Sequence, residues 1–173
     1  YWDFDFLAKA INKMHDRSNV KCAFHGDGPM KSKLSLSLHK KDLVEFGGRF
    51  DRGDVGFLLN KETDVLVLPP KTKSDMVLTG GLSTKMFDYL AMGLPILAPS
   101  DGEIPTILKH EENCLLYRTD DVEDFCVRVN DLLSSKSVCT RVANNAYKEF
   151  LDRYSWRARM YELIKNLENE SII

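Results

Sequence analysis

Apolar positions along the chain follow two different periods, one typical of helices and one typical of buried strands. Between Asp3 and Met14 the apolar residues recur at steps of three and four, so this segment is expected to form an amphipathic helix. The apolar run at 20–24 is shorter and ends in the turn sequence HGDGP. A short apolar run closed by turn residues is typical of a buried strand. The first two elements predicted are therefore a helix and a strand.

The same alternation continues to the end of the chain. Further strands are expected at 44–47, 64–68, 96–98 and 114–117, and helices at 30–39, 55–60, 84–92 and 103–109. A long helical tail is expected from about 122 to about 169, with a break near Ser155. Strands with little polar alternation, each separated by a helix, indicate a parallel sheet covered on both faces. The sequence therefore predicts one doubly wound, Rossmann-like α/β domain over residues 1–173. Because such domains normally open on a strand, we also expect a strand upstream of Tyr1.

Charge and cysteine content narrow the classes of partner and compartment. The 173 residues suffice for one domain with a full core, and 24 basic against 26 acidic residues give a net charge of -2. This balance does not favour a nucleic-acid partner. The four cysteines lack C-x-x-C spacing, and no apolar run approaches the roughly 20 residues needed to span a bilayer. We therefore expect a soluble, cytoplasmic chain with reduced cysteines that belongs to a longer protein.

The stretch GGLSTKMFDYLAMGLPILAPS, residues 80–100, places glycines, a lysine and a carboxylate at the start of a predicted helix. Gly80 and Gly81 let the backbone approach a ligand without a Cβ in the way. Lys85 adds a cation where the helix dipole disfavours one unless an anion also binds nearby. Free N–H groups at a helix start favour an anion, and here they belong to Leu82, Ser83, Thr84 and Lys85. This combination predicts a phosphate site.

Asp88 follows Lys85 by about one helical turn and lies on the same side of the predicted helix. Its carboxylate can accept both hydroxyls of a ribose whose phosphates bind at the helix start, so the spacing fits one nucleoside diphosphate. The alternative is that Lys85 and Asp88 form an exposed ion pair, which would contribute roughly a few tenths of a kcal/mol. The pattern alone leaves both interpretations open.

Five sequence blocks occur in a fixed order over nearly the whole chain: HGDGP, VEFGGRF, DVLVLPP, STKMFDYLAMGLPILAP and GEIPTILKHEENCLLY. Together they resemble the C-terminal, donor-binding half of GT-B glycosyltransferases of the family-4 kind (glycosyl transferases group 1). The form K-x-x-[DE]-Y-x-A-x-G-x-P and the opening YWDFDF resemble a subset of these enzymes that builds cell-surface polysaccharides.

The resemblance implies roles for individual residues. Asp88 matches the second Glu of the E-x7-E motif, which holds the ribose, and Lys85 would assist with the diphosphate. The segments that match ligand-contacting loops are Gly81 to Thr84 for the diphosphate, Arg49 and Phe50 for the base, and His25 to Gly28, with Gly26 and Gly28, at the interdomain cleft.

Two departures from the family pattern bear on the donor site. Gly80 stands where the first Glu of the motif would contact the donor sugar, so sugar recognition is expected to differ or to be weaker. The basic pair that many members place before the first helix is also not visible, and its Lys position falls near Trp2. Lys85 and the helix start are therefore expected to supply the positive charge that binds the phosphates.

The remaining polar and aromatic residues give no reason to expect a metal site or a further catalytic group. His25 and His110 have no second ligand at a metal spacing, so no metal site is expected. Glu103 precedes Ile-Pro at a predicted helix start, where a carboxylate acts through the dipole and capping. Trp156 lies at helical spacing in the tail and is interpreted as core or interdomain packing.

The resemblance implies the donor domain of a retaining glycosyltransferase that acts in cell-surface polysaccharide or glycolipid synthesis. The donor would be a UDP- or GDP-sugar, no metal would be required, and the catalytic residues are not identified. A glycan or lipid-linked acceptor would bind an N-terminal domain outside residues 1–173, and the whole protein could associate peripherally with the inner membrane surface. Two alternatives stay open: a nucleotide-sugar epimerase of the same architecture, and a non-catalytic nucleotide-binding or interaction module.

Overall fold

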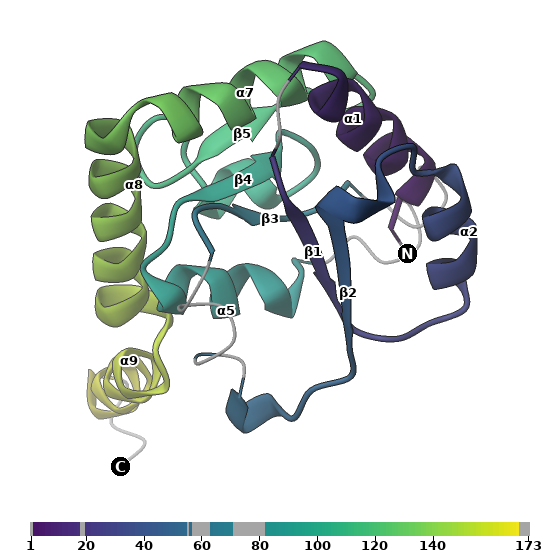
Figure 1. Cartoon of the computed structure of the whole chain (residues 1–173). Coiled ribbons are helices and arrows are strands. Elements are labelled where there is room, and N and C mark those ends of the chain that lie inside the picture. The colour runs from purple at the N-terminus through teal and green to yellow at the C-terminus, as the bar shows by residue number, and fades with distance from the viewer. Residues whose placement is uncertain (1, 18–19, 55, 57–62, 71–81, 170–173) are drawn as a thin grey trace.

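Five short strands and a series of helices alternate in the computed structural model (Figure 1), which describes residues 2–17, 20–54, 56, 63–70 and 82–169. The strands are β1 (Cys22–His25), β2 (Val44–Gly48), β3 (Leu66–Val67), β4 (Ile96–Pro99) and β5 (Leu115–Tyr117). The helices are α1 (Phe4–Arg17), α2 (Met30–Ser37), α5 (Thr84–Met92), α6 (Ile104–Ile107), α7 (Val122–Ser134), α8 (Lys136–Glu149) and α9 (Trp156–Asn169). The predicted helix at 55–60 lies almost entirely outside the described residues.

Every strand pair in the described chain is parallel. β1 pairs with β2, and β3, β4 and β5 form a second sheet in that order. The ladder of β3 extends beyond its two residues, because the N–H of Leu66 donates to the Pro95 carbonyl and that of Leu68 to the Leu97 carbonyl, both at 2.8 Å. A strand within the predicted range 64–68 is therefore confirmed, although it starts at Leu66, and the parallel α/β class is confirmed as well.

Helices cover both faces of the β3–β5 sheet, and β4 shows this most clearly because all of its residues are buried. Leu97 packs in a cluster with α1 and α7, whereas Ile96 and Ala98 pack in a second cluster with α5 and α6. Figure 1 shows α7 and α5 on opposite sides of this sheet. The run of consecutive apolar residues follows from this arrangement, since successive side chains point to opposite faces.

An aromatic group fixes α1 against the sheet. The rings of Phe6 and Tyr117 stack with centroids 5.8 Å apart, and both meet Phe125 edge-on, at 5.9 and 5.0 Å. Phe6 comes from α1, Tyr117 from β5 and Phe125 from α7, so the group joins three elements. Asp3 caps α1, because its Oδ1 accepts the N–H of Phe6 at 2.9 Å. The predicted amphipathic helix is confirmed and extends to Arg17.

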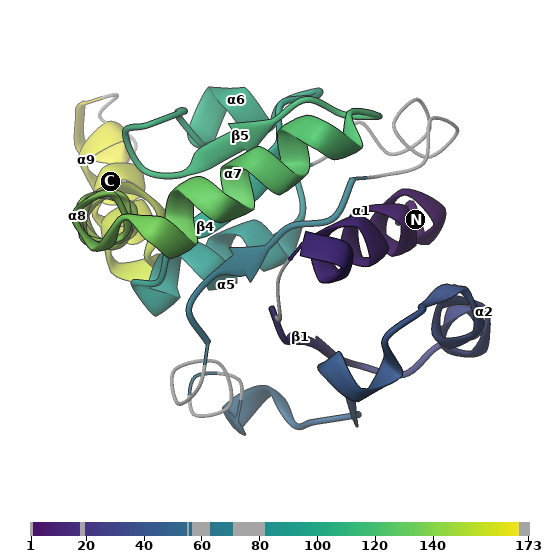
Figure 2. The same cartoon turned by 45° about the horizontal axis from the view of Figure 1, so that its top comes forward.

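The two sheets are not hydrogen-bonded to each other, although the sequence predicts one continuous sheet. Figure 2 shows β1 and α2 well apart from β4 and β5. In a doubly wound order, the strand that precedes the first helix lies between these two groups of strands. The expected strand upstream of Tyr1 would occupy that place, and it stays a prediction.

The C-terminal tail differs from the single interrupted helix that was expected. Ser135 is extended and starts α8, where its Oγ accepts the N–H of Val138 at 3.4 Å, so the tail has an additional break. The break near Ser155 is confirmed, and a π-helical turn, Phe150–Tyr154, precedes it. Trp156 is 85% exposed, so its interpretation as a core residue of this domain is wrong. No helix in the described part of the chain is long and apolar enough to cross a bilayer.

Truncating Leu90 to Ala should lower the free energy of unfolding by about 2–5 kcal/mol, because this α5 side chain is fully buried and its loss leaves a cavity. Denaturant unfolding followed by circular dichroism measures the change. Leu36→Ala is the matched control, since Leu36 lies on α2 and is 78% exposed. Equal destabilisation by the two substitutions would contradict the assignment of α5 to the core.

Stability should also fall above pH 9, because two thiols are neutral in the folded chain. Burial raises the pKa of Cys22 from 9.0 to about 11 and that of Cys114 to about 12. A raised pKa contributes stability that is fully present below the unfolded pKa and is lost as the pH rises towards the folded value. Each thiol should cost about 1.4 kcal/mol per pH unit in this window. Unfolding curves between pH 8 and pH 11 for the native chain and Cys114→Ala test this, and the variant should show the shallower decline.

Candidate functional site

The predicted phosphate site is the amino end of α5, and Ser83 fixes where this helix starts. Ser83 is extended and its Oγ accepts the N–H of Lys85 at 3.3 Å, while its carbonyl accepts the N–H of Met86 at 3.0 Å. Met86 and Leu90 are fully buried and hold the helix on the sheet. Gly93 ends the helix with a positive φ of 64°, which glycine adopts without strain. The site therefore lies at one end of a well-anchored helix.

The first turn of α5 leaves donors for a ligand. A helix start cannot pair its first N–H groups internally, and the Ser83 side chain takes up the N–H of Lys85, which corrects the expectation that this group is free. Within the described residues, the N–H of Thr84 has no partner. Because Ser83 Oγ acts as an acceptor in the cap, its hydroxyl proton can still be donated. Gly80 and Gly81 lie outside the described residues.

Lys85 and Asp88 do not form the ion pair that the sequence left open. Both are described and exposed, and no contact within 4.0 Å joins their charged groups. The Lys85 ammonium instead lies 5.2 Å from the ring centroid of Trp2, at cation–π distance. Sequence reasoning missed this neighbour, because Trp2 precedes Lys85 by more than eighty positions and no local pattern links them.

Asp88 projects one turn beyond Lys85, and its neighbour Tyr89 turns inwards. Burial raises the pKa of Tyr89 to about 12, and the negative charge of Asp88 adds to the shift. The Tyr89 hydroxyl donates to the Val67 carbonyl at 3.4 Å, so this residue ties α5 to β3. Tyr89 is therefore structural, whereas the Asp88 side chain is exposed and has no hydrogen-bond or ion-pair partner among the described residues.

A second group of predicted residues follows β1 and β2. Gly26 adopts φ +136°, which side chains rarely allow, and its N–H donates to the Gly48 carbonyl at 2.6 Å. Gly28 is exposed and has no neighbour within 4 Å of an added Cβ. The parallel register shifts between Phe24 and His25, so the strand pair carries an irregularity at its carboxyl end, where His25 lies opposite Gly48.

His25 and Phe50 meet at the same end of the strands. Their rings lie edge-on with centroids 6.0 Å apart, and Arg49 is exposed beside Phe50. Gly47 allows the His25 ring to pack, because a Cβ there would lie 2.5 Å from Nδ1. The sequence did not indicate this role of Gly47. The described residues include no group of three or more His, Cys, Asp or Glu side chains placed to bind a metal.

The α5 group and the β1–β2 group both lie beyond the carboxyl ends of parallel strands, which is where ligands bind in open α/β sheets. The structure thus places all the predicted residues that it describes at this edge: Gly26, Gly28, Arg49, Phe50, Leu82, Ser83, Thr84, Lys85 and Asp88. Within the described part of the chain, no side-chain hydrogen bond or ion pair joins the two groups directly.

Of three polar residues near α6, His110 and Asn113 have structural explanations, whereas Glu103 does not. His110 accepts the N–H of Leu116 through Nδ1 at 3.0 Å. Glu103 stands at the start of α6, but its side chain makes no capping hydrogen bond, so the capping interpretation is wrong. Asn113, which sequence reasoning missed, is buried and accepts the N–H of Lys109 at 2.7 Å while donating to the Ile107 carbonyl. Its amide holds the loop that enters β5.

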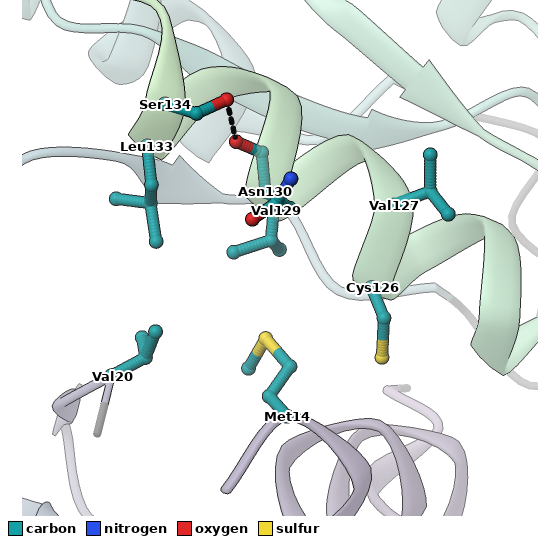
Figure 3. A pocket seen from close by; sticks show the side chains of 8 residues that line it. All are labelled: Met14, Val20, Cys126, Val127, Val129, Asn130, Leu133 and Ser134. Carbon is teal, nitrogen blue, oxygen red and sulfur yellow. Dashed lines mark hydrogen bonds between the residues drawn. The ribbon is translucent and has the colours of Figure 1, made fainter. Parts of the chain in front are cut away.

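A pocket of about 450 Å³ lies elsewhere, between the end of α1 and one face of α7 (Figure 3). Its lining is mostly aliphatic, with Met14 and Val20 facing Val129 and Leu133. None of the predicted site residues lines it. The Ser134 hydroxyl at its rim is already bonded to the Asn130 carbonyl at 2.7 Å. The pocket therefore offers little polar chemistry and does not compete with the α5 site.

Comparison with known proteins gives two curated relatives. Over 155 aligned residues, the chain is 28% identical to an uncharacterized glycosyltransferase of Methanocaldococcus jannaschii. The match covers 88% of this chain and 38% of the relative. The chain is also 28% identical over 157 residues to the sulfoquinovosyl transferase of Arabidopsis thaliana, covering 89% of this chain and 28% of that protein. The chain thus spans less than two fifths of the length of either relative.

Solved structures share the fold. HepE of Anabaena, solved with UDP, superimposes with a TM-score of 0.71 at 16% identity, over 96% of this chain and 44% of that one. At that identity the likeness concerns the fold alone. The family model described as glycosyl transferases group 1 matches residues 3–149, which is most of the chain. The chain therefore belongs to the glycosyl transferases group 1 family.

Proposed function

We propose that this chain forms the donor site of a glycosyltransferase, and that the amino end of α5 binds the diphosphate and ribose of a nucleoside-diphosphate sugar. The observation that supports this most directly is the exposed Lys85 ammonium, which lies at a capped helix start without a carboxylate partner among the described residues. Family membership supports the same reaction class. HepE, which shares the fold, has been solved both with UDP and with UDP-glucose.

The helix start suits a leaving diphosphate. When the glycosidic bond breaks, the diphosphate gains negative charge, so groups fixed in advance stabilise the transition state more than the bound donor. The Thr84 N–H and the Ser83 hydroxyl supply donors, and the helix dipole adds a partial positive charge. Lys85 supplies a full positive charge. None of these interactions requires a metal ion, and we propose none.

The remaining predicted residues fit other parts of the donor. The Asp88 carboxylate would accept the two ribose hydroxyls, since it lies one turn beyond Lys85 and faces solvent. Phe50 and Arg49 would contact the base, while Gly26 and Gly28 leave the loop after β1 open to the ligand. The base would be uracil or guanine.

The transfer that we propose retains the anomeric configuration and delivers the sugar to a glycan or lipid-linked acceptor. The motif running from Lys85 to Pro95 supports a role in cell-surface polysaccharide or glycolipid synthesis. The acceptor would bind another part of the protein, because the described site residues account only for donor contacts. Such an acceptor would bring the protein to the inner face of the membrane as a peripheral component. The family match favours transfer over epimerisation.

Substituting Lys85 or Asp88 should weaken nucleotide binding. Lys85→Ala and Asp88→Asn should each lower the binding free energy for UDP or GDP by about 1–3 kcal/mol, because each removes a hydrogen bond that involves a charged group. Isothermal titration calorimetry of the native chain with both nucleotides identifies the base and measures the losses.

Lys148→Ala serves as the matched control, since Lys148 is an exposed lysine on α8, away from the helix start. It should leave affinity unchanged. Failure of the native chain to bind either nucleotide would overturn the donor site and favour a non-catalytic module. Binding that is insensitive to both substitutions would place the nucleotide elsewhere.

Residues 1–173 alone should bind a donor but transfer no sugar, because the acceptor site is proposed to lie outside them. Incubation with radiolabelled UDP- and GDP-sugars and a mixed glycan acceptor, followed by chromatography of the products, tests this expectation. Label found in a glycan product would contradict it.

A further inference from the structure

Trp2 lies beside Lys85 at the proposed diphosphate site, near the position where many members of the family place a lysine. It lies one position before the range matched by the family model. Its ring faces the Lys85 ammonium at 5.2 Å, and the residue is half-buried against the cluster that includes Leu68 and Met86. The indole therefore has one part fixed in the core and one face towards Lys85.

The backbone around Trp2 is held from two directions. The N–H of Asp3 donates to the Pro70 carbonyl at 2.8 Å, which ties this segment to the chain that follows β3. The Asp3 side chain caps α1, and the Trp2 carbonyl accepts the N–H of Phe4 at 3.1 Å. The ring position is consequently set by two anchored elements.

The electrostatics of the helix start explain why such a ring matters. A lysine in the first turn is repelled by the helix dipole, and α5 has no acidic residue in that turn. No described carboxylate pairs with Lys85. The face of an indole ring carries negative potential and attracts an ammonium group. Trp2 therefore offsets an unfavourable charge position without supplying a carboxylate that would repel phosphate.

We propose that Trp2 is a positioning residue for the diphosphate: its ring holds the Lys85 ammonium over the amino end of α5 before the ligand binds. A lysine side chain has many rotamers, and restricting them in advance lowers the entropy lost on binding. When a diphosphate binds, the ammonium contacts the phosphate oxygens while it stays over the ring, so the contact with Trp2 persists in the complex. This inference rests on the proposed donor site, so its test must separate the two.

The first test needs no ligand. Ring currents should shift the ε-methylene protons of Lys85 upfield in the native chain, as measured in a ¹H–¹³C correlation spectrum with Lys85→Arg used for assignment. Trp2→Phe should keep part of the shift, and Trp2→Leu should abolish it. An unshifted Lys85 signal in the native chain would overturn the proposal.

The second test measures binding without changing the shape of the ring. Trp156, the only other tryptophan in the sequence, is first replaced by Phe. In this Trp156→Phe protein, Trp2 is then labelled with 5-fluoro- or 5,7-difluorotryptophan. Fluorine weakens the negative face of the ring, so UDP affinity should fall stepwise, by about two- to fivefold in total. Affinity for uridine, which lacks the phosphates, should not change. Fluorescence of Trp2 should also change on UDP binding but not on uridine binding.

A double-mutant comparison separates this inference from the donor site. In a Lys85→Met background, fluorination of Trp2 should no longer affect UDP affinity. Equal losses with and without Lys85, or for uridine as for UDP, would mean that Trp2 acts by packing and would overturn the proposal. If Lys85→Ala weakens UDP binding but fluorination of Trp2 does not, the donor site is supported and only the proposed role of Trp2 is overturned. Absence of UDP binding by the native chain would overturn both.

Discussion

The burial of β4 on both of its faces is the constraint on which the rest of the structure depends. Leu97 faces α1 and α7, and Ile96 and Ala98 face α5 and α6, so one strand positions four helices. Since β4 lies between β3 and β5, the three parallel strands end at one edge. The amino end of α5 is therefore presented at the edge where open α/β sheets bind ligands.

The side of α5 that is buried in the core decides which of its side chains are exposed at that edge. Met86 and Leu90 are fully buried, which turns Lys85 and Asp88 towards solvent. A helix start with an ammonium, and with an N–H group that has no partner among the described residues, is a favourable place for an anion. The absence of acidic residues in the first turn keeps the local potential positive. One side of this short helix therefore packs in the core, and the opposite side carries the charged groups that are proposed to bind the ligand.

Local patterns pointed to the candidate residues at the start of α5 because their signals lie within one element. The spacing from Lys85 to Asp88 indicated a cation and a carboxylate on one side of a helix, and both side chains are exposed on α5. The N–H of Lys85 was expected to be free, but Ser83 accepts it. Gly47 and Trp2 were missed, because each acts on a residue far away in the sequence. The same reason explains Asn113, whose amide bridges backbone groups that form a loop only after folding.

The sequence by itself determined the order of helices and strands, their parallel arrangement and the family, because apolar period and motif spacing are properties of contiguous residues. It could not show that β1–β2 and β3–β5 form separate sheets, that Ser135 divides the tail, or that Trp156 stays exposed. Nor could it decide whether Lys85 and Asp88 form an ion pair. Those outcomes depend on contacts between distant segments, whose free energies are decided only when the chain packs.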